Sequence, residues 1–251
     1  MTIASPLHQF ELVPIVSLKM GNVDLSFTNS SFFMILSTFL ISVFLILSMQ
    51  KKAIIPGRWQ SLAEVSYEFI ANMARENIGL DGRKYFPFVF SLFMFLLFGN
   101  MLGMIPYSYT FTSQIIVTFG LAMMVFVLVT LIGIAKHGLR FLLFFVPKGV
   151  PVFLLPLIIP IEIISYLSRP VSLSVRLFAN MMAGHTMLKV FAGFTVMLGV
   201  YGIAPLAINV ALTAFEIMVA ALQAYVFTIL TCLYLNDAFL LHTATTEKRK
   251  E

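Results

Sequence analysis

The chain has 251 residues, of which 60% are hydrophobic and 11% are charged. Soluble domains carry roughly 25% charged residues, so this composition excludes an ordinary soluble protein and predicts an all-α membrane protein that crosses the bilayer several times. The length allows about five or six helices, most of them apolar segments of about 20 residues. We expect one integral membrane domain over residues 1–251.

The formal net charge of +5 indicates membrane topology rather than binding to nucleic acid. Twelve of the 16 Lys and Arg residues fall in three segments, residues 51–84, 136–148 and 248–250. Alternate membrane crossings would put these segments on one side, and the positive-inside rule makes that side the cytoplasm, or the matrix of an organelle. We therefore expect no nucleic-acid partner.

Metal and nucleotide sites are not expected in this chain. Cys232 is the only cysteine, which excludes an internal disulfide, and the four histidines lack the spacing of a metal site. The sequence contains no GxxxxGKS or GxxxxGKT phosphate-binding loop, and no GxGxxG follows a strand-like run. We expect no cofactor and no metal, and any ATP would be bound by another chain.

Residues 1–85 are predicted to contain one membrane span and one helix that lies at the membrane interface. Residues 1–30 are moderately polar, lack the pattern of a signal peptide, and should lie on the outer side. Phe32 to Met49 is uncharged and forms the first span. In residues 61–77 apolar side chains recur at three- and four-residue steps, which is typical of an interfacial amphipathic helix. We expect this helix to act as a scaffold, and regulation by specific lipids is the alternative.

Residues 86–135 are predicted to form two spans, the first running outward to Ile105 and the second returning from Gln114. Asn100 and two glycines lie late in the first of these spans. Small residues at such positions permit close packing of helices. The alternative is that they form the polar lining of an aqueous cavity.

The remaining apolar sequence, residues 150–241, contains two segments that are too long for simple crossings. Residues 150–191 would form a helix of about 63 Å at roughly 1.5 Å per residue, whereas the hydrocarbon core is about 30 Å thick. This segment either makes two crossings or is one long helix lying far from the membrane normal, and its prolines permit kinks without deciding between the two. Residues 204–241 are similarly long, and glycines with Pro205 mark the turn between the segments.

One face of the first long segment is predicted to be polar. At about 100° per residue, four polar residues fall within about 40° of one another on a helix. They are Glu162, Arg169, Arg176 and Asn180. His185 lies about 180° from Arg176, so it belongs to the opposite face unless the helix bends at Gly184.

The second long segment repeats this arrangement. Asn209, Glu216 and Gln223 are spaced by seven residues, and Tyr234 lies within about 60° of the same line. Asp237 falls nearby, close to the cytoplasmic end. An ionisable residue inside a membrane is a functional-site hypothesis by default, and a row of such side chains can order water and pass protons.

Arg176 is the most unusual residue of the sequence. A guanidinium stays protonated, and placing it at bilayer depth costs from about 2.5 to more than 10 kcal/mol. In a purely structural alternative, Glu162 pairs with Arg169 and Glu216 pairs with His185. Arg176 would then lack a carboxylate of its own, because Glu162 is about 21 Å away along the helix axis. We expect its counter-charge to come from another subunit.

Three stretches of the sequence carry a family resemblance: Phe98 to Tyr107, Pro160 to His185 and Ala211 to Leu235. An arginine inside RLFxN, followed by a helix with Glu and Gln seven residues apart, is a specific combination. In these stretches the chain closely resembles subunit a of the F-type ATP synthase, of the alphaproteobacterial and mitochondrial kind, which is the membrane stator subunit facing the rotating c-ring. Residues 1–85 match only in layout. The resemblance implies that residues 150–241 form one long, tilted helical hairpin against the ring.

The resemblance, taken with the polar rows, implies a proton path built from two offset half-channels. Arg176 would be the essential arginine that faces the ring carboxylate and separates the half-channels. The outer half-channel would contain His185, Glu216, Asn209, Asn180 and Gln223. The inner half-channel would contain Glu162, Asp237, Arg169 and Tyr234. Arg169 either borders this inner path or only anchors Glu162.

The resemblance also implies an assembly and a location. The partners would be the c-ring subunits, the b subunits of the peripheral stalk, other ATP synthase subunits and membrane lipid, with one copy of this chain per complex. The location would be the bacterial inner membrane, or the mitochondrial inner membrane for an organelle-encoded chain. The chain would be a proton-channel subunit without a catalytic nucleotide site.

The sequence has two alternative functional interpretations. One is a membrane enzyme that uses Glu216 and His185 as an acid–base pair, which the absence of an accompanying nucleophile or metal set disfavours. The other is a purely structural scaffold, against which an unpaired Arg176 argues.

Overall fold

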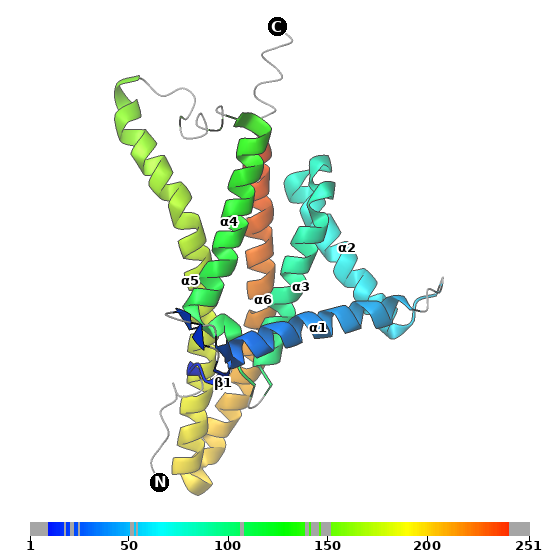
Figure 1. The fold of residues 1–251 in the computed structure, drawn as a ribbon. Coiled ribbons are helices and arrows are strands. Elements are labelled where there is room, and N and C mark those ends of the chain that lie inside the picture. Colours follow the sequence, from blue (N-terminus) through cyan, green and yellow to red (C-terminus); the bar gives the residue numbers. More distant parts are fainter. Residues whose placement is uncertain are drawn as a thin grey trace.

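The chain folds into long α-helices, as its composition predicts. The computed structural model describes residues 10–17, 19–20, 23–24, 26–50, 53, 55–105, 108–138, 141, 146 and 152–240. Within these ranges there are six α-helices (Figure 1). They are α1 (Asn29–Met49), α2 (Arg58–Ile78), α3 (Phe86–Gly103), α4 (Ile115–His137), α5 (Leu155–Met197) and α6 (Ile203–Leu240). The short 3-10 helices are η2 (Leu80–Lys84), η3 (Phe111–Ser113), η5 (Val152–Leu154) and η6 (Gly199–Gly202).

Five of these helices are long and apolar enough to cross a membrane: α1, α3, α4, α5 and α6. Helix α2 is different, because one face packs on the core while the rest carries charged side chains together with exposed apolar ones such as Leu62 and Val65. Ile70, Met73 and Ile78 on that face are buried, whereas Glu64 and Glu68 are exposed. The amphipathic helix predicted over residues 61–77 is therefore confirmed, together with the all-α class.

Two short β-ribbons, which were not expected from the sequence, precede α1. Strand β1 (Pro14–Val16) pairs with β4 (Phe27–Thr28), and β2 (Lys19–Met20) pairs with β3 (Val23–Asp24), both antiparallel. Asn29 ties the first ribbon to α1, since its backbone N–H donates to the Val13 carbonyl at 3.1 Å. Strands of two or three residues are too short to show the period-two pattern by which strands are recognised.

The two long C-terminal segments are single helices. Helix α5 has 43 residues and continues through Pro160 and Pro170, and α6 has 38. The two run antiparallel and lie side by side over much of their length, and they are joined at η6, where Gly199 has a φ of 55° (Figure 1). In this view the start of α5 leans away from α4 and α6. Of the two alternatives for the first segment, one long helix is the one found, and the tilt of the hairpin in a membrane stays a prediction.

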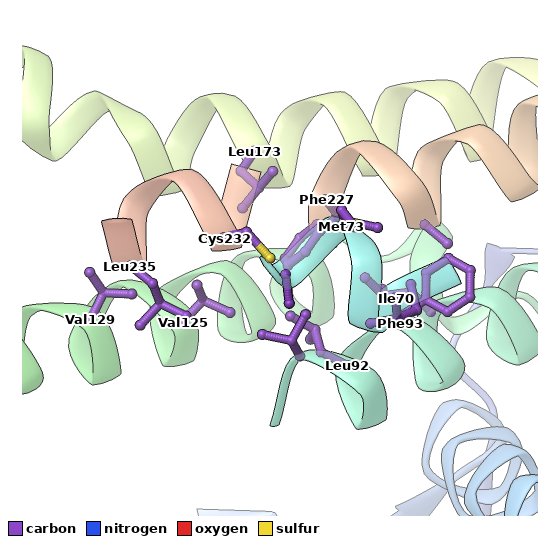
Figure 2. Packing of buried hydrophobic residues seen from close by; sticks show 14 of the residues in the cluster. Ile70, Met73, Leu92, Phe93, Val125, Val129, Leu173, Phe227, Cys232 and Leu235 are labelled. Carbon is purple, nitrogen blue, oxygen red and sulfur yellow. The ribbon is translucent and has the colours of Figure 1, made fainter. Parts of the chain in front are cut away.

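The apolar core lies where α2, α3, α4, α5 and α6 meet (Figure 2). Figure 2 shows Met73 of α2 beside Phe227 of α6, and Ile70 of α2 beside Phe93 of α3. Helix α6 also carries two fully buried alanines, Ala220 and Ala224. Small side chains let helix backbones approach closely in a membrane. Helix α6 therefore packs against α2, α3 and α4 as well as against α5.

Asn100 forms a buried polar joint between α3 and α6. Its Nδ2 donates to the Ala220 carbonyl at 3.1 Å, and its Oδ1 accepts from Thr112 Oγ1 at 2.9 Å. A Cβ added at Gly99 would overlap the Phe111 ring. Asn100 is fully buried, so this region fits the packing alternative rather than the lining of an aqueous cavity.

Candidate functional site

Three polar contacts cross the α5–α6 hairpin, one after another along its length. They join His185 to Glu216, Asn180 to Gln223 and Arg169 to Asp237. Because the helices are antiparallel, the order of the residues along α5 is reversed along α6. The hairpin therefore brings Arg169 and Asn180 of the first predicted row against α6. It also brings His185 there, which the helical angles had placed on the opposite face of α5.

The contact nearest the η6 turn contains a buried carboxyl group. Glu216 is 5% exposed, and its Oε1 lies 3.4 Å from Nδ1 of His185. This separation is longer than an ordinary N–H···O hydrogen bond, and neither carboxyl oxygen has a hydrogen-bond partner in the described part of the chain. A Cβ added at Gly184 would lie 2.5 Å from Oε1. Glu216 therefore rests against the backbone of α5 at a position where only glycine leaves room.

The next contact joins two amides. Asn180 Nδ2 donates to Gln223 Oε1 at 2.8 Å. Gln223 Nε2 is buried without a hydrogen-bond partner among the described residues, and so is Oδ1 of Asn209. Buried polar atoms in proteins are nearly always hydrogen-bonded. Three positions of α6, each seven residues apart, therefore hold buried polar atoms with unused bonding capacity.

The contact farthest from the turn is an ion pair. Arg169 Nη1 donates to Asp237 Oδ2 at 2.8 Å, and its guanidinium lies 5.1 Å from the ring centroid of Tyr234 and 5.4 Å from that of Tyr166. Glu162 is seven residues earlier, about 10 Å along the helix axis, and has no ion pair within the described ranges. Among the described residues Arg169 therefore pairs with Asp237 and not with Glu162, and its role beside the inner path stays a prediction.

Arg176 takes part in none of these contacts. It is exposed on α5, and it has neither a hydrogen bond nor an ion pair with any residue that the structure describes. Exposed apolar side chains share this helix and its partner, among them Val175 on α5 and Leu222 on α6. The polar face predicted for α5 is thus divided, because Arg169 and Asn180 form hydrogen bonds with α6 whereas Arg176 forms none with the described residues.

His185 has a second contact, which comes from outside the hairpin. Its Nε2 lies 2.9 Å from Oγ1 of Thr110, in the connection between α3 and α4. No pattern in the sequence pointed to Thr110. The one available signal is the segment from Thr110 to Gln114, which is polar apart from Phe111 and lies between two apolar spans.

The segment before α1 also reaches this end of the hairpin. Gln114 Nε2 donates to the Phe10 carbonyl at 2.7 Å and to Tyr109 Oη at 2.6 Å. Burial raises the pKa of Tyr109, which lies outside the spanning helices, so its phenol stays protonated and donates to the same carbonyl. The Phe10 ring is thereby held 6.4 Å from the His185 ring, centroid to centroid.

Comparison with known proteins agrees with the resemblance seen in the sequence. The family model of the ATP synthase A chain matches residues 31–236. The chain is 57% identical over 246 residues to ATP synthase subunit a of Paramagnetospirillum magneticum, an alignment that covers 95% of this chain and 100% of the relative. It is 56% identical over 239 residues to that of Rhodospirillum rubrum, covering 95% and 99%. It is 59% identical over 240 residues to that of Parvibaculum lavamentivorans, covering 93% and 92%.

These matches extend over nearly the whole chain, and the five apolar helices fit a protein of the membrane sector. The protein is thus a multi-pass membrane protein whose partners are other ATP synthase subunits. The chain belongs to the ATP synthase A chain family, the subunit a family of ATP synthase.

Proposed function

We propose that this chain conducts protons between the two sides of the membrane and a rotating ring of c subunits, through two offset half-channels separated by Arg176. The observation that carries the proposal is that Arg176 is exposed and unpaired within the described chain. Its guanidinium is exposed on α5 without a partner in the described chain, between one polar cluster at His185 and another at Asp237. A charge at membrane depth pairs with another charge or faces water, so we assign its counter-charge to a carboxylate of the ring.

The outer half-channel is formed by the end of the hairpin nearest the η6 turn. Glu216 and His185 lie 3.4 Å apart there, and both carboxyl oxygens have bonding capacity to spare. The buried amide atoms of Asn209 and Gln223 continue the row along α6. Such groups can hold water and pass a proton to a ring carboxylate opposite Arg176.

Arg176 acts as an electrostatic gate in this scheme. A fixed positive charge favours the ionised form of an arriving carboxyl group, so the ring site releases its proton as it approaches. The same charge repels a proton that would cross directly between the half-channels. Each elementary charge moved across the membrane is worth about 2.3 kcal/mol per 100 mV, which gives the rotation its driving force.

The inner half-channel is formed by the opposite end of the hairpin. The ion pair of Arg169 and Asp237 is partly exposed, with 23% and 39% of the side chains accessible. Tyr234 lies beside this pair, and Glu162 lies seven residues before Arg169 on α5. These groups take up the released proton and pass it to the inner side.

The proposed assembly contains one copy of this chain, the c-ring and the b subunits of a peripheral stalk. We place it in a bacterial inner membrane, since the relatives compared above are bacterial. Exposed apolar side chains on both long helices provide the surface that the ring and the lipid would cover.

Replacing Arg176 with alanine tests the proposal. We expect Arg176→Ala to assemble into the complex and to lose ATP synthesis driven by an imposed proton gradient in vesicles. Arg75→Ala is the matched control, because Arg75 is an exposed arginine of α2 outside the hairpin, and it should synthesise ATP at the wild-type rate. Wild-type synthesis by an assembled Arg176→Ala complex would overturn the proposal.

A further inference from the structure

One hydrogen bond from outside the hairpin restrains the imidazole of His185. Thr110 Oγ1 lies 2.9 Å from Nε2, while Nδ1, the other ring nitrogen, faces Glu216. Thr110 is 5% exposed, and His185 is the partner that the structure records for its hydroxyl within the described residues. The hydroxyl is therefore committed to the histidine that adjoins the buried carboxyl group.

The position of Thr110 is itself fixed by its surroundings. Its carbonyl accepts hydrogen bonds from Oγ of Ser113 at 2.6 Å and from the Ser113 backbone N–H at 3.1 Å. Its side chain lies directly against α3, where a Cβ added at Gly103 would overlap it. Thr110 thus provides a firm support for His185 rather than a chance contact on a free loop.

A hydroxyl suits this position because it can both donate and accept a hydrogen bond. A neutral imidazole has one N–H donor and one bare acceptor nitrogen, whereas a protonated imidazole donates from both. When Nδ1 donates toward Glu216, a neutral His185 needs a donor at Nε2 and a protonated His185 needs an acceptor. Rotation of the Thr110 hydroxyl about its Cβ–Oγ bond meets both needs without moving the ring.

We propose that Thr110 is a positioning residue of the outer half-channel: its hydroxyl holds the His185 imidazole directed at Glu216 in both protonation states. The proposal deepens the proposed function and rests on it. Thr110 touches neither the ring carboxylate nor Glu216 in this scheme, so it acts only through His185.

Two substitutions separate the hydroxyl from the packing of the side chain. Thr110→Val keeps the shape and removes the hydroxyl, and we expect ATP synthesis by the complete complex under an imposed proton gradient to fall about tenfold, equal to about 1.4 kcal/mol. Thr110→Ser keeps the hydroxyl and should stay within about twofold of wild type. Thr118→Val is the matched control, since among the described residues the hydroxyl of this buried threonine bonds only to the carbonyls of Gln114 and Ile115 at the start of α4, and it should not alter the rate.

A spectroscopic measurement tests the hydrogen bond directly. In the 15N NMR spectrum of the histidine-labelled complex, Thr110→Val should shift the imidazole nitrogen signals of His185, and Thr118→Val should leave them in place. Unchanged signals in Thr110→Val would overturn the proposal, as would synthesis at the wild-type rate.

The outcomes distinguish the positioning role from the proposed function. Glu216→Gln, measured in the same vesicles, tests the outer half-channel without reference to Thr110. If Glu216→Gln abolishes synthesis and Thr110→Val does not affect it, the positioning role fails and the half-channel stands; wild-type synthesis by Glu216→Gln refutes the half-channel itself. If the complex with Thr110→Val does not assemble, Thr110→Ser decides the question. ATP synthesis near the wild-type rate in Thr110→Ser supports the role of the hydroxyl. A tenfold loss of synthesis in Thr110→Ser shows that the methyl group matters instead, and it overturns the proposal.

Discussion

Replacing Gly184 with alanine would place a methyl group where Glu216 now packs against α5. The added Cβ would lie 2.5 Å from Oε1, 2.8 Å from Cδ and 3.1 Å from Cγ of Glu216. Ordinary contacts between such atoms are about 3.5 to 4.0 Å, so the carboxyl group must retreat by roughly 1 Å. The distance between Oε1 and Nδ1 of His185, already 3.4 Å, would then move further beyond the range of an ordinary N–H···O hydrogen bond.

This change should affect proton transfer far more than stability. Overpacking costs about 1 to 3 kcal/mol, and exchanging glycine for alanine inside a helix returns about 0.8 to 1.0 kcal/mol. The net loss of stability is therefore small, while a displacement of about 1 Å in a reacting group can reduce a rate by about a hundredfold. We expect gradient-driven ATP synthesis to fall by about ten- to a hundredfold in Gly184→Ala, with the complex still assembled.

Two further variants complete the assay. Gly193→Ala is the matched control on the same helix, because a Cβ there meets no atom within 4 Å, and synthesis should be unchanged. Adding Glu216→Asp to Gly184→Ala shortens the acid by one methylene and should recover part of the rate. Wild-type synthesis in assembled Gly184→Ala would refute the reasoning that the close approach of Glu216 to α5 is needed for proton transfer.

The remaining predictions concern the buried side chain of Asn100 and the ion pair of Asp237. Asn100→Leu removes two buried hydrogen bonds and leaves the Thr112 hydroxyl unpaired. The free energy of unfolding should fall by about 1 to 3 kcal/mol, which is measured as a lower thermal unfolding midpoint of the subunit. Asn77→Leu, which loses one described bond inside α2, is the control, and an equal effect of both variants would contradict the prediction. Asp237→Asn breaks a partly exposed ion pair, which should cost less than about 1 kcal/mol while slowing ATP synthesis several-fold, and an unfolded subunit would show that the pair is structural.

The helices could be predicted from the sequence because apolar length and a 3.6-residue period are local signals. Residues 61–77 fall inside α2, and the first long segment, placed at residues 150–191, corresponds to α5 (Leu155–Met197). The observed ends of this helix differ from the predicted ones by several residues, because a continuous apolar run contains no signal for where a helix begins or ends. The β-ribbons before α1 were missed because strands of two or three residues carry no periodicity.

The candidate site could be predicted along each helix but not between helices. Seven-residue spacing put Glu216 and Gln223 on one face of α6, where both are buried. The angle of about 180° put His185 on the face of α5 opposite Arg176, yet His185 contacts α6 just as Asn180 and Arg169 do. The pairing of Arg169 with Asp237 could not be predicted, because it depends on the register that the turn gives to two antiparallel helices. Thr110 lies 75 residues before His185, and no local pattern joins them.

The central claim is that the counter-charge of Arg176 belongs to another subunit. Electron cryomicroscopy of the complete ATP synthase can measure it directly, as the distance from the Arg176 guanidinium to the nearest carboxylate. We predict a carboxylate of the c-ring within about 4 to 6 Å, the range over which opposite charges act strongly on each other. A carboxylate of this chain, such as Glu162, in that place would contradict the account.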